Sequence, residues 1–353
     1  MTPMQNSSQL TLRSRRLGFA MRVDRRAPLV IAVLSMVILA VAVLNLTLGS
    51  FPVTAVDALK TALRLESANP DYHFIVNELR LPRTLVAIAV GMGLAVSGVV
   101  LQGLTRNVLA APSIIGVNAG ASVTIVAAII AFPQLSTRYY PPVAMIGAFI
   151  AITLIFLLAW RGGSSPLRLI LVGIGVNAVA WAISSTLIVF GDIERVTGAL
   201  VWMVGSVNDS SWKHLTAVAP WLLVLLPFVL LSARTLNALN LGDAIAVGLG
   251  VRLEWQRGLL IFASVALAAS AVSVAGTVGF VGLMAPHIAR QLVGSSHEGL
   301  IPTAALVGGL VVLAADTVGR NLFAPTQIPA GIFTAILGAP YFLYLLYRNR
   351  NEW

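Results

Sequence analysis

The sequence is divided into apolar blocks of about 20 residues that are separated by short polar segments. A helix of about 20 apolar residues can cross the hydrocarbon core of a bilayer. Strands of a transmembrane β-barrel would be about 10 residues long with alternating polarity, which these blocks lack. The pattern predicts an all-α polytopic membrane protein with about ten transmembrane helices. They lie at about 29–49, 82–104, 112–131, 142–160, 168–190, 214–233, 257–274, 277–293, 301–320 and 330–347.

Composition narrows the classes of function. Of the 353 residues, 58% are hydrophobic and 10% are charged, whereas soluble domains carry about 25% charged residues. Cysteine is absent, which excludes disulfides and thiolate metal sites, and the four histidines (His73, His214, His287, His297) have no ligand spacing. We therefore expect the chain to bind no metal or other cofactor. Its net charge of +10 comes without a basic patch interleaved with exposed aromatic residues, so nucleic acid is not an expected partner.

The arginines and lysines predict the topology. The first 28 residues contain six arginines, and the apolar run after them is longer than the core of about 7–15 residues in a cleaved signal peptide. We expect a cytoplasmic basic tail at 1–28, a single transmembrane domain at 29–348 and a second cytoplasmic tail at 349–353. With this orientation 15 basic residues are cytoplasmic and 8 are outside, as the positive-inside rule requires.

Two stretches outside the blocks have helical periodicity. Residues 234–257, which we name the coupling segment, are too short and polar to span a bilayer. Their apolar residues Leu241, Ala244, Ile245, Gly248 and Leu249 recur at three- and four-residue spacing, and Asp243 suits the first turn of a helix. This predicts a short amphipathic helix in the water phase that a partner can contact. Val53 to Arg64 predicts another on the outer surface.

The chain lacks the motifs of an energy-converting enzyme. A P-loop needs Gly-Lys followed by Ser or Thr, and the only lysines, Lys60 and Lys213, do not follow Gly. There is no nucleophile elbow and no metal motif. Asp316 is the clearest acid within a span, and Arg320 follows it by four residues, which predicts a local ion pair. Because one acid at a helix end is weak support for an ion-coupled transporter, we expect a separate ATPase to supply energy.

Arg80-Leu81-Pro82-Arg83 precedes the second span. Pro82 suits the first turn of a helix, but two arginines at a helix N-terminus oppose its dipole. Lipid phosphates, Glu78 or an acidic partner could each compensate for them.

The two halves of the chain share a weak pattern. Each has spans rich in small residues and an Ala-Pro element, at Ala111-Pro112 and at Ala285-Pro286. This suggests an inverted repeat of spans 2–5 and 7–10. For the glycines of the second and third spans, which include Gly91, Gly98 and Gly120, we favour close helix packing over ligand binding.

A series of short motifs runs along the chain in this order: Arg80-Leu81-Pro82-Arg83, Ser97-Gly98, Gln102, Arg106-Asn107-Val108-Leu109-Ala110-Ala111-Pro112, Gly116, Asn118, Gly120, Leu241-Gly242-Asp243, Gly248-Leu249-Gly250, Gly276 to Gly282, Ala285-Pro286-His287-Ile288, Arg290, Ala315-Asp316, Ile328-Pro329-Ala330-Gly331 and Gly338-Ala339-Pro340. In this order they resemble the FecCD-type permeases of ABC importers for iron-siderophores and cobalamin. The resemblance covers about residues 29–348. Val108 stands where a Pro is usual, which affects only a cytoplasmic turn.

The resemblance implies a type II ABC importer permease with specific partners. These are two ATP-binding subunits that use ATP and Mg, a second permease subunit (identical or paralogous), a periplasmic or lipid-anchored substrate-binding protein, and membrane lipids. It implies that Arg80, Arg83 and Arg320 dock the binding protein. It places Leu241, Gly242, Asp243, Ala246, Leu249 and Gly250 at the ATPase, and makes Asn177, Ser184 and Ser185 candidates for the pathway lining.

The sequence leaves three functions to compare. The first is a permease subunit, without its own ATPase site, that moves ferric siderophore across the bacterial cytoplasmic membrane. The second is the same machinery for cobalamin or haem. The third is an ion-coupled secondary transporter, which predicts uptake without an ATPase and sensitivity to Asp316→Asn.

Overall fold

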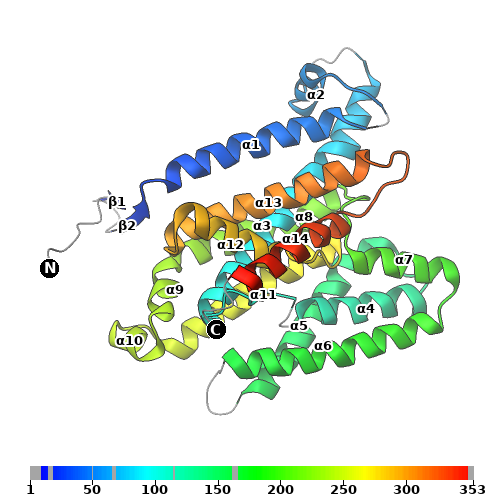
Figure 1. Cartoon of the computed structure of the whole chain (residues 1–353). Helices are drawn as coiled ribbons and strands as arrows, with labels where there is room; N and C mark the ends of the chain where they lie inside the picture. The colour runs from blue at the N-terminus through cyan, green and yellow to red at the C-terminus, as the bar shows by residue number, and fades with distance from the viewer. Residues whose placement is uncertain are drawn as a thin grey trace.

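The computed structural model describes residues 9–14, 19–49, 51–65, 69–113, 116–160 and 166–348. Within these residues the chain forms a helical bundle preceded by a two-stranded antiparallel hairpin (Figure 1). The elements are β1 (Gln9–Ser14), β2 (Phe19–Asp24), α1 (Ala27–Thr47), α2 (Ala55–Ala62), the π-helix η1 (His73–Arg80), α3 (Leu81–Thr105), α4 (Val117–Ala131), the 3-10 helix η2 (Thr137–Tyr139), α5 (Tyr140–Ala159), α6 (Pro166–Val189), α7 (Ile193–Val204), α8 (Trp212–Leu231), α9 (Ala233–Asn240), α10 (Asp243–Gly248), α11 (Leu253–Ala275), α12 (Val281–Val293), α13 (His297–Asn321) and α14 (Ala330–Arg348).

All ten apolar blocks contain a helix. Among the described residues, eight helices are long and apolar enough to cross a membrane. The other two blocks form the shorter helices α4, of 15 residues, and α12, of 13 residues. Both start late because the backbone before them is not helical: Gly116 has φ 83°, and the stretch before α12 runs from Gly276 (φ 68°) to Phe280 (φ 64°). The chain is thus a multi-pass, all-α membrane protein.

Helices α3, α11 and α13 form the centre of the bundle (Figure 1). Most of their residues are buried, whereas few residues of α1, α6 and α8 are buried. Close approach explains the small residues. A Cβ on Gly91 would lie 2.1 Å from the carbonyl oxygen of Gly308 in α13, and one on Gly98 would lie 1.8 Å from that of Gly282 in α12. Gly120 meets α5 in the same way, so the packing interpretation is confirmed for these glycines.

The packing partners repeat between α3–α6 and α11–α14. Helix α4 packs on α5 as α12 packs on α13, and α3 packs on α13 as α11 packs on α5. The first helices of the two units run in opposite directions, since Arg106 after the end of α3 and Arg257 near the start of α11 both contact Asp243. These correspondences agree with the suggested inverted repeat.

The helix that contains α3 starts earlier than the sequence predicts. The chain is already helical at His73, and a π-helix leads into α3, with the amide of Leu81 donating to the carbonyl of Val76. Pro82 has no N–H to donate and its ring disturbs the preceding turn, which suits a change of helix type there. The arginines of this motif therefore lie inside a longer helix, and the expected conflict with the dipole of an N-terminus was wrong.

Several smaller elements lie around the bundle. Helix α2 confirms the helix predicted within Val53 to Arg64 and is capped by the Thr54 side chain. Helix α7 was not predicted, and the basic tail forms β1 and β2. Ile114, Arg161 and the tail 349–353 lie outside the described residues.

Candidate functional site

The coupling segment projects from one end of the bundle (Figure 1). It forms α9, a break at Leu241 and Gly242, and α10. Gly242 (φ 118°) and Gly250 (φ 84°) bracket α10 in a backbone conformation that favours glycine. The predicted single helical pattern is thus divided by Gly242, and α10 proper begins at Asp243, as its carboxylate suggested.

The apolar side chains of this segment mostly face away from the protein. Leu241 is 63% exposed and Leu249 is 64% exposed, and Ile245 between them is also exposed. Ala246 differs, because it is fully buried against the rest of the chain. Gly242 and Asp243 are half-buried, and Gly250 is exposed. An exposed apolar surface on a helix outside the spans is a common mark of a protein contact.

Asp243 joins three parts of the fold. Its carboxylate accepts hydrogen bonds at 3.0 Å from Arg257, a buried residue of α11. It also forms an ion pair with Arg106, the residue after α3, whose Nε donates to the Leu239 carbonyl at 2.9 Å. Partial burial opposes ionisation of Asp243, but the hydrogen bonds and charges of the two arginines outweigh it and lower the pKa of Asp243. We name Asp243, Arg106 and Arg257 the Asp243 junction.

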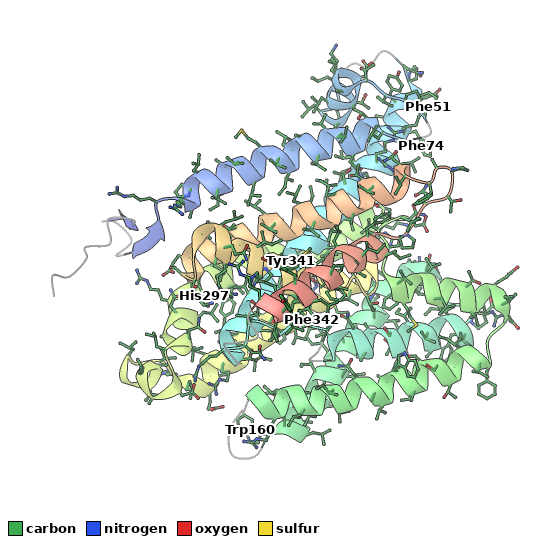
Figure 2. All side chains as sticks on the ribbon, viewed as in Figure 1. Phe51, Phe74, Trp160, His297, Tyr341 and Phe342 are labelled. Carbon is green, nitrogen blue, oxygen red and sulfur yellow. The ribbon has the colours of Figure 1, made fainter. Side chains whose placement is uncertain are left out.

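Helix α9 is attached separately to α13. The amide nitrogen of Asn237 donates to Glu298 at 2.7 Å, and its oxygen accepts from the backbone N–H of His297 at 3.1 Å. His297 is buried at the start of α13 (Figure 2). These contacts could not be predicted from the sequence, because Asn237 and Glu298 are 61 residues apart and share no local pattern.

The arginines predicted to dock a binding protein lie together at the opposite end of α3. We name Arg80, Arg83, Arg320 and Asp316 the arginine cluster. Arg80 donates to the carbonyls of Leu46 and Phe51, both at 2.6 Å. Arg320 donates to the carbonyls of Asn45 and Leu48. The last carbonyls of a helix lack partners within it and carry partial negative charge, so Arg80 and Arg320 cap the C-terminus of α1.

Arg83 forms the ion pair with Asp316 that the sequence spacing predicted for Arg320. Its guanidinium lies 2.7 Å from Asp316, and both side chains are buried. Arg83 also donates to the amide oxygens of Asn208 at 2.6 Å and Gln327 at 2.8 Å. The predicted local pair of Asp316 with Arg320 was wrong, because Arg320 binds carbonyls at the end of α1 and Asp316 is paired with Arg83 instead. The partners of Arg80 and Arg83 thus lie within the chain: one carboxylate, two side-chain amides and carbonyls near the end of α1.

The three candidates for the pathway lining differ in their surroundings. Asn177 donates to the carbonyls of Ser113 and Gly173, at 3.3 and 3.0 Å. Ser184 is buried, and its hydroxyl has no hydrogen-bond partner within the structure. Ser185 is half-buried. A pathway role for all three stays a prediction. Of the two serines, Ser185 is more accessible than Ser184.

Among the described residues, no three acidic or histidine side chains gather closely enough to hold a metal ion.

Comparison with known proteins gives the family. The model of the FecCD transport family matches residues 36–348. A Bacillus subtilis protein named as a probable siderophore transport system permease, YfhA, is 42% identical over 93% of this chain and 97% of its own length. The iron(3+)-hydroxamate import system permease FhuG of the same organism is 40% identical over 92% of this chain and 99% of its own. A solved structure described as a metal-chelate type ABC transporter in an inward-facing conformation has a TM-score of 0.81 at 34% identity, over 91% of this chain and 99% of that one. This chain therefore belongs to the FecCD transport family.

Proposed function

We propose that this chain is the membrane-spanning permease subunit of an ATP-driven importer in the bacterial cytoplasmic membrane, and that it moves ferric siderophores. The observation that carries the proposal is the exposed apolar surface of α10, which is held at one end of a bundle of spans by charged contacts. A chain with spans but no P-loop needs a surface on which a separate ATPase can act. The cargo follows from the relatives named for siderophore and for iron(3+)-hydroxamate.

The ATP-binding subunits would contact the coupling segment. Leu241 and Leu249 offer apolar side chains, and Gly242 and Gly250 allow the sharp turns that project α10. Ala246 would anchor the helix from its buried side, and Asp243 would orient it. ATP and Mg would be bound by the partner subunits, whose closure would move α10.

This role sets the orientation in the membrane. The α10 end would be cytoplasmic, and the arginine cluster and α2 would face outward. The start of α1 supports this, because Ala27 packs near Val293 at the end of α12, close to where α13 begins. Both termini would then lie in the cytoplasm, in agreement with the distribution of basic residues.

The arginine cluster would attract a substrate-binding protein. Three guanidinium groups face one carboxylate there, so two positive charges are balanced only by neutral oxygens. Carboxylates of a partner would be stronger acceptors than the carbonyls that these arginines now bind. Since Arg80, Arg83 and Arg320 are buried, docking would require an exchange of acceptors at this surface.

Docking can be tested by its salt dependence. We expect the affinity of the binding protein for the assembled importer to fall when the salt concentration rises from about 0.05 to about 0.5 M, because charge attraction is screened. Affinity that is the same at both concentrations would contradict electrostatic docking.

A second permease subunit, identical or paralogous, would complete the pathway. Helix α6 presents exposed apolar side chains such as Ile174 and Trp181, which would face this subunit or lipid. Ser185 on the same helix is the pathway candidate that such a partner could approach.

Uptake by a deletion strain tests the function and the cargo together. A strain that lacks this chain is complemented with the wild-type gene and supplied with radioiron-labelled ferric hydroxamate, labelled haem or labelled cobalamin. We expect uptake of the ferric hydroxamate alone, and its loss when a P-loop lysine of the partner ATPase is replaced. Uptake that persists without the ATPase would instead favour an ion-coupled transporter.

The coupling surface is tested by polar replacement of its apolar residues. Leu241→Ser and Leu249→Ser should leave the chain in the membrane but increase the ATP consumed per chelate imported. Leu63→Ser is the matched control, because Leu63 is 69% exposed at the other end of the bundle. Wild-type coupling in both variants would contradict the proposed ATPase contact.

A further inference from the structure

The Asp243 carboxylate joins α10 to two of the three helices at the centre of the bundle, α3 and α11. Arg106 follows the last residue of α3, and Arg257 lies in the first turns of α11. Both bind the Asp243 carboxylate, which begins α10. Helices α3 and α11 pack on each other along their length, and their Ser97 and Ser264 hydroxyls share a hydrogen bond of 2.8 Å. Asp243 therefore contacts the ends of a helix pair that is already joined.

The Asp243 junction differs from an ordinary surface ion pair. The Arg257 side chain is only 4% exposed, whereas Asp243 is 47% exposed. A buried guanidinium without an anion is unfavourable, so Arg257 holds Asp243 more firmly than a solvated arginine would. Arg106 is also fixed, because its backbone is left-handed (φ 51°) and its Nε binds the Leu239 carbonyl of α9.

We propose that Asp243 is a positioning residue that ties α10 to α3 and α11 at once, so that a displacement of α10 by the ATPase moves both of these helices. The inference rests on the proposed function. It differs from a simple contact role, because Asp243 would act on the chain's own helices and need not touch the partner. Charge-assisted hydrogen bonds resist separation as well as approach, whereas the apolar contact of Ala246 mainly resists approach. The junction would thus carry both the forward and the return movement.

The test compares two neutral replacements around the same arginine. Asp243→Asn removes the charge at the junction. Glu254→Gln is the matched control, because Glu254 is 49% exposed and lies 4.0 Å from Arg257, yet belongs to α11 itself. The complex is purified with its native partners, placed in liposomes and supplied with radioiron-labelled ferric hydroxamate. The readout is the number of ATP molecules hydrolysed per chelate imported.

We expect Asp243→Asn to raise this ratio by about fivefold, which corresponds to the loss of a partly exposed ion pair. Glu254→Gln should keep the wild-type ratio. Asp243→Glu, which retains the charge, should give a ratio close to that of the wild type. A wild-type ratio for Asp243→Asn would overturn the inference. An equal rise in Asp243→Asn and Glu254→Gln would also overturn it, because the effect would then belong to the charge around Arg257 in general.

A second variant covers the case in which Asp243→Asn does not assemble. Arg106→Gln changes a half-exposed side chain and should raise the same ratio. If the two residues act through one connection, the double variant should be no worse than the more severe single variant. Independent, multiplying effects would refute the connection. Absence of ATP-dependent import by the wild-type complex would refute the proposed function itself, whereas normal wild-type import with unaffected variants would refute only the role of Asp243.

Discussion

Replacement of Asp316 by Asn is the sharpest test of the arginine cluster. The Asp316 and Arg83 side chains are 2% and 8% exposed, and their charged atoms lie 2.7 Å apart. Removal of one partner from a buried ion pair costs about 3–5 kcal/mol, because the other charge stays buried without an anion. The new amide keeps one oxygen acceptor, and the oxygens of Asn208 and Gln327 remain. We therefore expect a destabilisation near the lower limit, about 3 kcal/mol.

The assay is thermal unfolding of the purified protein in lipid nanodiscs, followed by tryptophan fluorescence. Asp192→Asn is the control, because Asp192 pairs with Arg195 at 3.4 Å at an exposed site. An exposed pair contributes at most about 1 kcal/mol. The double variant Arg83→Gln with Asp316→Asn should be less destabilised than the sum of the single variants, since neither charge is then left alone.

Two results would refute this reasoning. The first is an Asp316→Asn variant no less stable than Asp192→Asn. The second is an Asp316→Asn variant that keeps wild-type stability but loses uptake completely, when uptake by the wild-type chain needs no ATPase. That result would point to Asp316 as a proton or sodium relay. The ion-coupled alternative and the structural role thus give opposite patterns of stability and transport.

Three further predictions concern the packing, α1 and the Asp243 junction. Gly308→Ala should cost about 1–3 kcal/mol by overpacking, because the new Cβ would lie 2.3 Å from a backbone oxygen of α3, while Gly258→Ala, which meets nothing within 4 Å, should be neutral in the same unfolding assay. Arg320→Gln should speed hydrogen exchange of residues 44–49 at the end of α1, measured by mass spectrometry, and unchanged exchange would contradict its capping role. Because the pKa of Asp243 is lowered in the folded protein, ionised Asp243 stabilises the fold. This stabilisation is fully present above the unfolded-state pKa and is lost as the pH falls through the folded-state pKa. The difference in melting temperature between wild type and Asp243→Asn should therefore stay constant from about pH 8 to pH 5 and shrink only below about pH 4.

Local features made the helices predictable. A block of apolar residues long enough to span a bilayer needs no tertiary information, because a spanning segment must satisfy its backbone internally. The helix boundaries differ from the predicted ones where the backbone is not α-helical, as at Gly116 before α4 and in the π-helix before α3. Helix α7 was missed although it has usable signals: Asp192 at its N-cap, Glu194 in its first turn and Gly205 after its end.

The pairing of charges was less predictable, because it is set by the tertiary fold. The i, i+4 rule joined Asp316 to Arg320, but Asp316 binds Arg83, which is 233 residues away. Likewise, Arg257 is 14 residues from Asp243 in the sequence, where no local pattern joins them, while the structure brings the two side chains together. Sequence spacing reports neighbours on one helix and cannot report which helices cross.

Helix α3 extends from the arginine cluster at one end of the molecule to the Asp243 junction at the other. Helices in lipid gain little from the hydrophobic effect when they associate, so specific contacts must position them. Helix α3 has such contacts throughout: Arg83 at its start, Gly91 and Gly98 at close crossings, and Arg106 just after its end. Its 25 residues extend about 37 Å at 1.5 Å per residue. Because the same rigid element binds the arginine cluster at one end and the Asp243 junction at the other, a tilt of α3 must change both. Docking of a partner at one end would therefore change the surface on which an ATPase acts at the other end, and the reverse, without any contact between the two partners.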